Sequence, residues 1–256
     1  MARFEYHLFP YLSDNYGVLI HDPDSGATAA VDCGEAGALL GALEQKGWKL
    51  TELWITHHHP DHTDGLMEVK QATGCLVRGP ELKSKPIAGL DETYWDGGSF
   101  TFAGERIGVI ATPGHTTDMI NFHLAGEATV FTGDTLFTLG CGRIFEGDPA
   151  MMWQSLQKLM ALPAETVVYS SHEYTLANAK FALSVDPENA TLKARAGKFE
   201  AMRAEGRPTV PSTMAEELAT NPFLRASDPA IRVHLGMEAA DDGAVFAEIR
   251  RRKDHF

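Results

Sequence analysis

Leu53-Trp54-Ile55-Thr56-His57-His58-His59-Pro60-Asp61-His62 is the stretch that decides what kind of molecule this chain forms. A strand-like run, Glu52–Thr56, is followed directly by five metal-competent side chains within six residues. Imidazoles and carboxylates are the ligands that zinc and its first-row neighbours prefer. In a tight turn, His57 and His59 can converge on one ion while Asp61 and His62 turn toward another. Pro60 bars a regular helix from continuing through the turn, so we predict a metal site at this strand end.

Three later strand-like runs also end in small or turn-forming residues and then one possible ligand. The segments at the ends of these runs are Thr112-Pro113-Gly114-His115, Thr132-Gly133-Asp134 and Ser170-Ser171-His172. Sites commonly assemble where strand ends meet loops. We therefore expect His115, Asp134 and His172 to complete the metal site.

The ligand set suits two divalent metal ions. We assign His57, His59 and His115 to the first ion and Asp61, His62 and His172 to the second, with Asp134 bridging both. Each ion then keeps an open position for water, and Asp61 and Asp134 are the candidate catalytic residues. Zinc is the expected metal, with iron and manganese as alternatives, because ligand identity does not fix the metal. We expect the other histidines to be surface or hydrogen-bonded residues: His7, His21, His58, His123, His234 and His255.

The predicted secondary structure changes near Tyr174. Before it, β-rich runs dominate, with a helix ending near Gly47 and another starting at Asp148-Pro149. After it, strand runs vanish and helical patterns take over, with expected starts at Asp186-Pro187 and Asp228-Pro229 and a capping box at Thr213-x-x-Glu216. We predict a mixed α/β domain over 1–173 and a smaller helical domain over 174–256. Other predicted strands are Arg3–Leu8, Tyr16–His21, Ala27–Asp32, Arg106–Thr112, Met119–Leu124, Ala128–Thr132 and Thr166–Ser170.

Composition narrows the class of protein. Hydrophobic residues make up 44% of the 256, and the formal charge is −13. An acidic chain repels phosphate at long range, so we expect no nucleic-acid partner. No apolar run is long enough for a membrane span, and residues 1–6 do not resemble a secretory signal, so we expect a cytoplasmic protein without a membrane partner. The three cysteines, Cys33, Cys75 and Cys141, form no disulfide framework, and we expect a monomer.

The ligand pattern His57-x-His59-x-Asp61-His62, with His115, Asp134 and His172, resembles the metallo-β-lactamase superfamily. Flanking segments resemble glyoxalase II, the hydroxyacylglutathione hydrolases, within it. The resemblance runs from Asp14-Asn15-Tyr16 to Arg251-Arg252-Lys253-Asp254. The segments that carry it are Thr112–Thr116, Thr132–Phe137, Gly140–Gly147, His172–Thr175 and Asn221-Pro222-Phe223-Leu224-Arg225.

The resemblance implies an αββα sandwich followed by a helical domain that completes the substrate site. It implies hydrolysis of the thioester S-D-lactoylglutathione to D-lactate and glutathione, the second step of methylglyoxal detoxification. The implied substrate-binding residues are Arg143, Phe145, Tyr174, Arg250 and Lys253. Phe145 departs from the family, where many members have Tyr, so a hydroxyl contact to glutathione would be missing. Ser171 replaces a usual Gly.

A local basic clamp is what a ligand with two carboxylates needs on an acidic protein. Arg250-Arg251-Arg252-Lys253 is the densest basic run of the chain, and Arg suits bidentate carboxylate contacts. The alternative is a helix end whose cations neutralise the helix dipole. Arg251 and Arg252 cannot face the same site as Arg250 and Lys253.

A thioester needs little beyond such a metal site. Bound metal ions lower the pKa of water, so that a nucleophile exists at neutral pH, and a metal can stabilise the developing oxyanion. A thiolate leaves without a strong general acid, since thiols have a pKa near ~8.5. Three alternatives stay open at this point: a glutathione persulfide dioxygenase with one iron, a phosphodiesterase or nuclease, and a non-catalytic binding module. Metal stoichiometry separates the first, the charge of −13 opposes the second, and the intact ligand set opposes the third.

Overall fold

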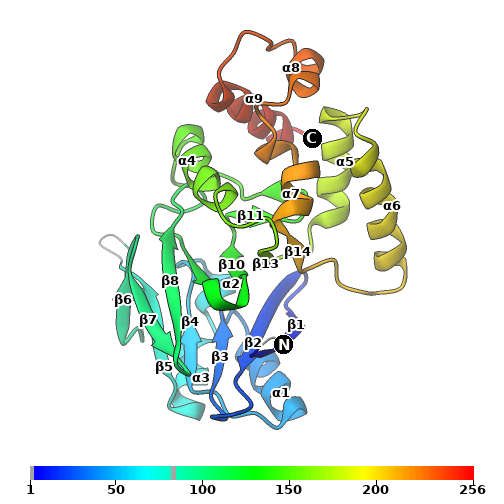
Figure 1. Ribbon diagram of the computed structural model, residues 1–256. Coiled ribbons are helices and arrows are strands. Elements are labelled where there is room, and N and C mark those ends of the chain that lie inside the picture. Colours follow the sequence, from blue (N-terminus) through cyan, green and yellow to red (C-terminus); the bar gives the residue numbers. More distant parts are fainter. Residues whose placement is uncertain (1–2, 82–84) are drawn as a thin grey trace. The chain divides into compact units, whose positions relative to one another are not determined.

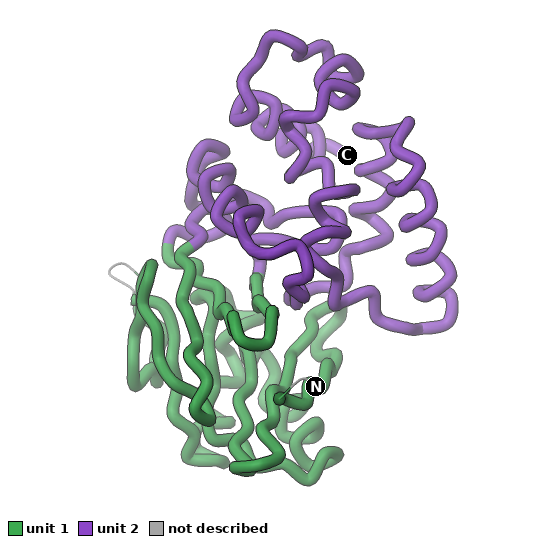
Figure 2. Tube along the Cα trace, viewed as in Figure 1, with its two compact units in different colours: residues 1–111, 118–133 green, residues 112–117, 134–256 purple. Residues whose placement is uncertain are grey.

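The structure is a computed structural model that describes residues 3–81 and 85–256. The chain divides into two compact units, coloured separately in Figure 2. Unit 1 comprises residues 1–111 and 118–133, and unit 2 comprises residues 112–117 and 134–256. The segment 112–117 is thus an excursion from unit 1 that belongs to unit 2.

Unit 1 contains two β-sheets (Figure 1). In the first, β1, β2 and β3 pair antiparallel, and β3, β4, β5 and β6 pair parallel. In the second, β7 to β10 are antiparallel neighbours in chain order. The strands are β1 (Glu5–Tyr11), β2 (Asn15–His21), β3 (Thr28–Val31), β4 (Glu52–Trp54), β5 (Leu76–Pro80), β6 (Glu92–Tyr94), β7 (Ser99–Phe102), β8 (Glu105–Ala111), β9 (Ile120–Leu124) and β10 (Thr129–Gly133).

Side-chain alternation along β4 decides what each face of the first sheet packs against. Leu53 and Ile55 join one core with α1 (Ala36–Lys46) and α3 (Leu66–Thr73). Trp54, between them, points to the other face, where its ring lies 5.2 Å from Phe100 and 5.5 Å from Phe122 of the second sheet. The two sheets therefore pack face to face, with helices on the outer face of the first. The remaining helices of this unit are the short α2 (Pro60–Thr63) and η1 (Ala125–Glu127).

Unit 2 is mostly helical. A core of Leu139, Ala182, Leu192 and Phe199 holds α5 and α6 together, and Trp153 stacks on Phe246 at 5.5 Å to join α4 to α9. The elements are β11 (Leu136–Phe137), β12 (Gly140–Cys141), α4 (Pro149–Met160), β13 (Val167–Ser170), α5 (Thr175–Val185), α6 (Ala190–Ala204), β14 (Ser212–Thr213), α7 (Met214–Thr220), η2 (Pro222–Leu224), α8 (Pro229–Leu235) and α9 (Asp242–Asp254).

The mixed α/β class with C-terminal helices is confirmed, as are the capped helix starts at Asp148, Thr213 and Asp228. Gly47 ends α1 in the left-handed region at φ 69°, as predicted. The expected helix start at Asp186-Pro187 is wrong. Asp186 instead ends α5, while the Asn189 side chain accepts the hydrogen bond from the Leu192 backbone that starts α6.

Some elements were not predicted. The strand β14 lies in a region where we expected strands to vanish, and it pairs antiparallel with β13. The strands β5, β6 and β7 and the helix α3 were also missed. Among the described residues, no helix is both long and apolar enough to cross a membrane.

Candidate metal centre

Four of the predicted ligands lie together in unit 1, where the chain leaves β4 and enters α2. The Nε2 atom of His57 lies 3.1 Å from Nδ1 of His59, and the rings of His57 and His62 are 4.1 Å apart. The Nε2 atom of His62 lies 3.3 Å from Oδ2 of Asp61. Pro60 occupies the first turn of α2, which it starts rather than interrupts. The predicted tight turn is therefore a loop running into one helical turn.

A buried carboxylate that sequence reasoning missed, Asp32, orients two of these histidines. It accepts hydrogen bonds from the backbone N–H of Thr56 at 2.8 Å and from Nδ1 of His62 at 2.9 Å. The Thr56 hydroxyl bonds Asp32 at 2.9 Å and lies 3.0 Å from Nδ1 of His57. Because the hydroxyl donates to the carboxylate, it accepts from His57. In both histidines Nδ1 then carries the proton, which leaves the lone pair of Nε2 for a metal ion.

Asp32 could have been found from the sequence, because it follows a strand just as the ligands do. It stands immediately after β3, with φ at 60°, and precedes Cys33-Gly34.

Asp61 is held from two sides. The side-chain amide of Asn15 donates to Oδ2 at 3.0 Å, and the Tyr11 hydroxyl donates to the Asp61 carbonyl at 2.9 Å. A Cβ at Gly34 would lie only 2.1 Å from that carbonyl, so the close approach of the two segments requires glycine. His58, by contrast, bonds Asp118 at 3.1 Å, as expected of a hydrogen-bonded residue.

The other three predicted ligands lie together in unit 2. Oδ2 of Asp134 is 3.3 Å from Nε2 of His115, and Oδ1 of Asp134 is 3.3 Å from Nε2 of His172. All three residues are buried, with exposures of 4–6%. One carboxylate thus presents a different oxygen to each imidazole, which is the arrangement that a bridging ligand needs.

The protonation of His115 provides a test of whether a cation fits there. Its Nδ1 lies 2.7 Å from the carbonyl oxygen of Arg143, which can only accept, so Nδ1 carries the proton. In the neutral ring, the lone pair of Nε2 then faces the carboxylate of Asp134. Two acceptors directed at each other suit a bound cation, and the donor set fits zinc, iron or manganese.

Three of the predicted substrate residues are exposed beside these ligands. The Arg143 side chain is 64% exposed and its guanidinium lies 5.8 Å from the ring of Phe145. Phe145 is 59% exposed and packs its ring 5.2 Å from that of His115. Tyr174 stacks on His172, with ring centroids 4.7 Å apart. The structure therefore places these aromatic residues against two of the predicted ligands.

The two predicted substrate residues of α9, Arg250 and Lys253, differ from Arg143. Arg250 is buried, donates to the Cys141 carbonyl at 3.1 Å and pairs with Asp254 at 2.7 Å. The ammonium of Lys253 lies 3.2 Å from the carbonyl of Ala177, and burial lowers the pKa of this lysine. Arg251 and Arg252 both pair with Glu248, so they do not share the surroundings of Arg250 and Lys253.

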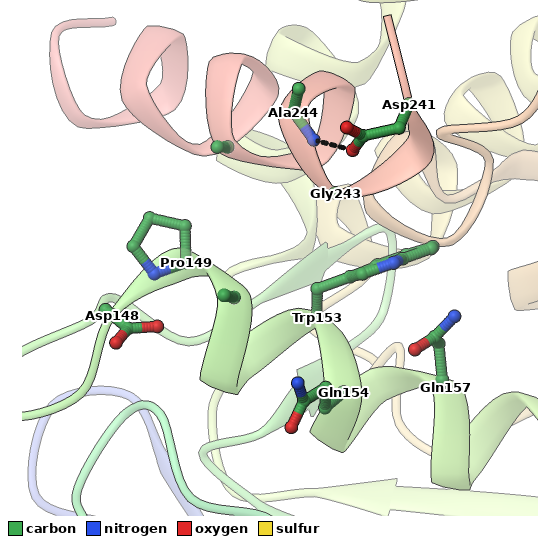
Figure 3. Close-up of a pocket in the computed structure, with 10 residues that line it drawn as sticks. Asp148, Pro149, Trp153, Gln154, Gln157, Asp241, Gly243 and Ala244 are labelled. Carbon is green, nitrogen blue, oxygen red and sulfur yellow. Dashed lines mark hydrogen bonds between the residues drawn. The ribbon is translucent and has the colours of Figure 1, made fainter.

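A separate pocket of about 590 Å³ lies between α4 and α9. Figure 3 shows Trp153 between Gln154 and Gln157 on one side and Asp241 and Gly243 on the other. It contains none of the predicted ligands.

Comparisons with known proteins identify the family of the chain. Residues 15–172 match the model of the metallo-β-lactamase superfamily, and residues 173–256 match the hydroxyacylglutathione hydrolase C-terminus. The chain is 53% identical over 252 residues to a hydroxyacylglutathione hydrolase of Mesorhizobium japonicum, covering 98% of this chain and 99% of the relative. It is 53% identical to one of Rhizobium meliloti over the whole of both chains. The solved structure of ETHE1 from Myxococcus xanthus is similar in fold, with a TM-score of 0.65 and 23% identity over 98% of this chain and 97% of that one.

Proposed function

The chain belongs to the hydroxyacylglutathione hydrolases of the metallo-β-lactamase superfamily, and from this membership we propose how its residues divide the work. It is a thioester hydrolase that converts S-(2-hydroxyacyl)glutathione into a 2-hydroxy acid and glutathione. The fold, together with the groups of His and Asp side chains that could hold a metal, indicates two divalent metal ions. We propose zinc as the metal and the D-lactoyl thioester as the substrate.

We propose that the seven predicted ligands hold two metal ions. His57, His59 and His115 would hold the first, Asp61, His62 and His172 would hold the second, and Asp134 would bridge them. The single observation that carries this proposal is the orientation of the Asp134 carboxylate. Its Oδ2 lies 3.3 Å from Nε2 of His115, and its Oδ1 lies 3.3 Å from Nε2 of His172.

The protein's own groups have distinct tasks. Asp32 and the Arg143 carbonyl fix the proton on the outer nitrogens of His62 and His115, so that their inner nitrogens stay available. Asn15 orients the carboxylate of Asp61, which we assign to positioning the attacking water. When bound, the metal ions would lower the pKa of that water and stabilise negative charge on the carbonyl oxygen. The leaving thiolate needs no strong acid, and no side chain has to supply one.

Arg143 is the residue that we assign to a carboxylate of the glutathione moiety, because its guanidinium is open to solvent beside Phe145. Lys253 and Tyr174 are assigned to the same moiety. Arg250 is assigned an indirect part in binding this moiety. Its guanidinium donates to the carbonyl of Cys141, which stands two residues before Arg143.

A substitution at Phe145 should raise the affinity for the glutathione thioester. We expect Phe145→Tyr to lower KM for the glutathione thioester several-fold, because one added hydrogen bond contributes about 0.5–1.5 kcal/mol. The value of kcat should stay unchanged, and steady-state kinetics measure both. A KM that rises would contradict the assignment of this ring to glutathione.

The decisive experiment follows the loss of the thioester in S-D-lactoylglutathione while elemental analysis counts the metal. We expect turnover with two ions per chain. One iron per chain, with oxygen consumed on a glutathione persulfide, would indicate the dioxygenase of the same superfamily instead.

We further propose that residues 1–173 form the catalytic domain and 174–256 the substrate-binding domain. The family models meet at residues 172 and 173, which supports this boundary. It differs from the division into compact units, since β11, β12, α4 and β13 belong to the second unit. A cytoplasmic monomer is our proposal for the working form.

A further inference from the structure

A buried polar chain runs through unit 2, outside the ligand set. Glu217 of α7 is fully buried, and Oε1 accepts a hydrogen bond from Arg195 of α6 at 2.7 Å. Its other oxygen accepts from the Asn221 amide at 3.0 Å. Arg195 also donates to the Thr220 hydroxyl at 2.7 Å. We call Arg195, Glu217 and Asn221 the buried triad.

The triad bonds the backbone of one hairpin, β11–β12. The Asn221 amide lies 2.9 Å from the carbonyl of Gly140 and 3.3 Å from that of Phe137. Oε2 of Glu217 accepts from the backbone N–H of Leu139 at 2.9 Å. Leu139 stands in the left-handed region at φ 58°, which is costly for a side chain of this kind. The triad thus holds a turn that its own residues disfavour.

Other helical residues bond the same hairpin. Asn178 of α5 donates to the carbonyl of Thr138 at 3.1 Å, and Arg250 of α9 donates to that of Cys141. A Cβ at Gly140 would lie 2.5 Å from the Asn178 amide, so the two segments are in close contact. Three helices therefore fix the hairpin through its backbone groups.

The hairpin carries functional residues at both ends. Asp134 stands two residues before Leu136, and Arg143 stands two residues after Cys141. The ends are tied together by the hydrogen bond from Gly142 N–H to the Thr135 carbonyl at 3.2 Å. Whatever moves the hairpin therefore moves the bridging carboxylate and the exposed guanidinium together.

We propose that Asn221 and Glu217 are positioning residues, which set Asp134 for the metal ions and Arg143 for glutathione at the same time. The proposal rests on the proposed function of those two residues. A buried ion pair such as Arg195–Glu217 is a poor source of stability, because desolvation offsets its attraction. The Glu217 carboxylate makes two further hydrogen bonds, to Leu139 and Asn221, and these connect the ion pair to the hairpin. Asn221 opens the segment Asn221-Pro222-Phe223-Leu224-Arg225.

Asn221→Ala tests the proposal, with Asn189→Ala as the matched control. Asn189 also caps a helix of unit 2 and donates to a backbone carbonyl, that of Ala219, but it bonds no hairpin atom. We expect Asn221→Ala to lose metal at a chelator concentration about tenfold lower than the unmodified chain, as for other residues that support metal ligands. The control should keep the unmodified value even if its Tm falls equally.

A second readout concerns substrate discrimination. Kinetics would compare S-D-lactoylglutathione with a lactoyl thioester of a small neutral thiol, which has no carboxylate for Arg143. We divide kcat/KM for S-D-lactoylglutathione by kcat/KM for the neutral thioester. Asn221→Ala should lower this ratio about tenfold. Should Asn221→Ala fail to fold, Asn221→Ser, which keeps the cap oxygen, is expected to show smaller shifts in the same directions.

The outcomes separate the two proposals. If the unmodified chain neither hydrolyses the glutathione thioester nor binds two ions, the proposed function fails. If it does both, and the Asn221 variant keeps its metal retention and discrimination while losing Tm, the triad is only structural and this inference is overturned.

Discussion

At the scale of single residues, the informative feature of this site is which atom each side chain presents. Nδ1 of His62 and of His115 is engaged by oxygen atoms of Asp32 and Arg143, which leaves Nε2 for the metal. Arg143 and Arg250 are alike in type, but one is open to solvent and the other is enclosed. Substitutions at these two positions should therefore differ in their effects.

Arg143→Ala should raise KM for the glutathione thioester by roughly 10–100-fold and leave kcat within about twofold, because a charged hydrogen bond contributes about 1.5–3 kcal/mol. Steady-state kinetics on S-D-lactoylglutathione provide the measurement. Arg251→Ala is the control, since that side chain is equally exposed and pairs with Glu248. An unchanged KM in the Arg143 variant would remove this residue from the binding site.

The buried thiols predict a pH dependence. Burial raises the pKa of Cys33 to about 12 and that of Cys141 to about 11, from a usual value of 9.0. Unfolded thiols therefore lose their protons first, so the stabilisation is complete below pH 9 and is lost as the pH rises toward 11–12. The free energy of unfolding should fall as the pH rises from about 9 to about 11, and native protein should resist alkylation at pH 8. In the double variant Cys33→Ala/Cys141→Ala, the free energy of unfolding should fall less steeply with pH. An identical slope would show that these two thiols are not its cause.

At the scale of elements, local signals located the helices of unit 2 where the capping atoms are adjacent in sequence. The capping box of Thr213 and Glu216 formed as predicted. Asp186 failed as a helix start because its carboxylate pairs with Arg225 at 3.3 Å and accepts from Asn189 at 2.8 Å. A distant partner thus decided between two neighbouring candidates.

Thr213→Ala should lower the free energy of unfolding by about 1 kcal/mol, the usual cost of losing such a cap. Glu216→Gln keeps an oxygen for the Thr213 N–H and should cost less. Urea unfolding of the two variants measures the difference. If the glutamine variant proved the more destabilised, the charge of Glu216 rather than the cap would be the main contribution.

At the scale of the whole molecule, the ligands are divided between the two compact units, four in one and three in the other. A metal pair bound by all seven would stabilise the folded chain by mass action. Treatment with a chelator should lower Tm by an amount on the order of 10 °C, and added zinc should restore it. Asp134→Asn should show a much smaller chelator effect. A chelator without influence on the unmodified chain would show that these residues hold no metal.

The sequence alone determined the family and the fold class, and it predicted the ligands of the site. Ligand types at strand ends, and segments such as Gly140–Gly147, are local patterns that need no tertiary information. The two long-range results, Asp32 serving His57 and His62 and the buried triad bonding the β11–β12 hairpin, came only with the structure. Asp32 is 24 residues from Thr56, whose hydroxyl lies against His57, and 30 residues from His62, and Asn221 is 81 residues from Gly140. Hydrogen bonds across such separations depend on how strands and helices pack, and no spacing along the chain encodes them.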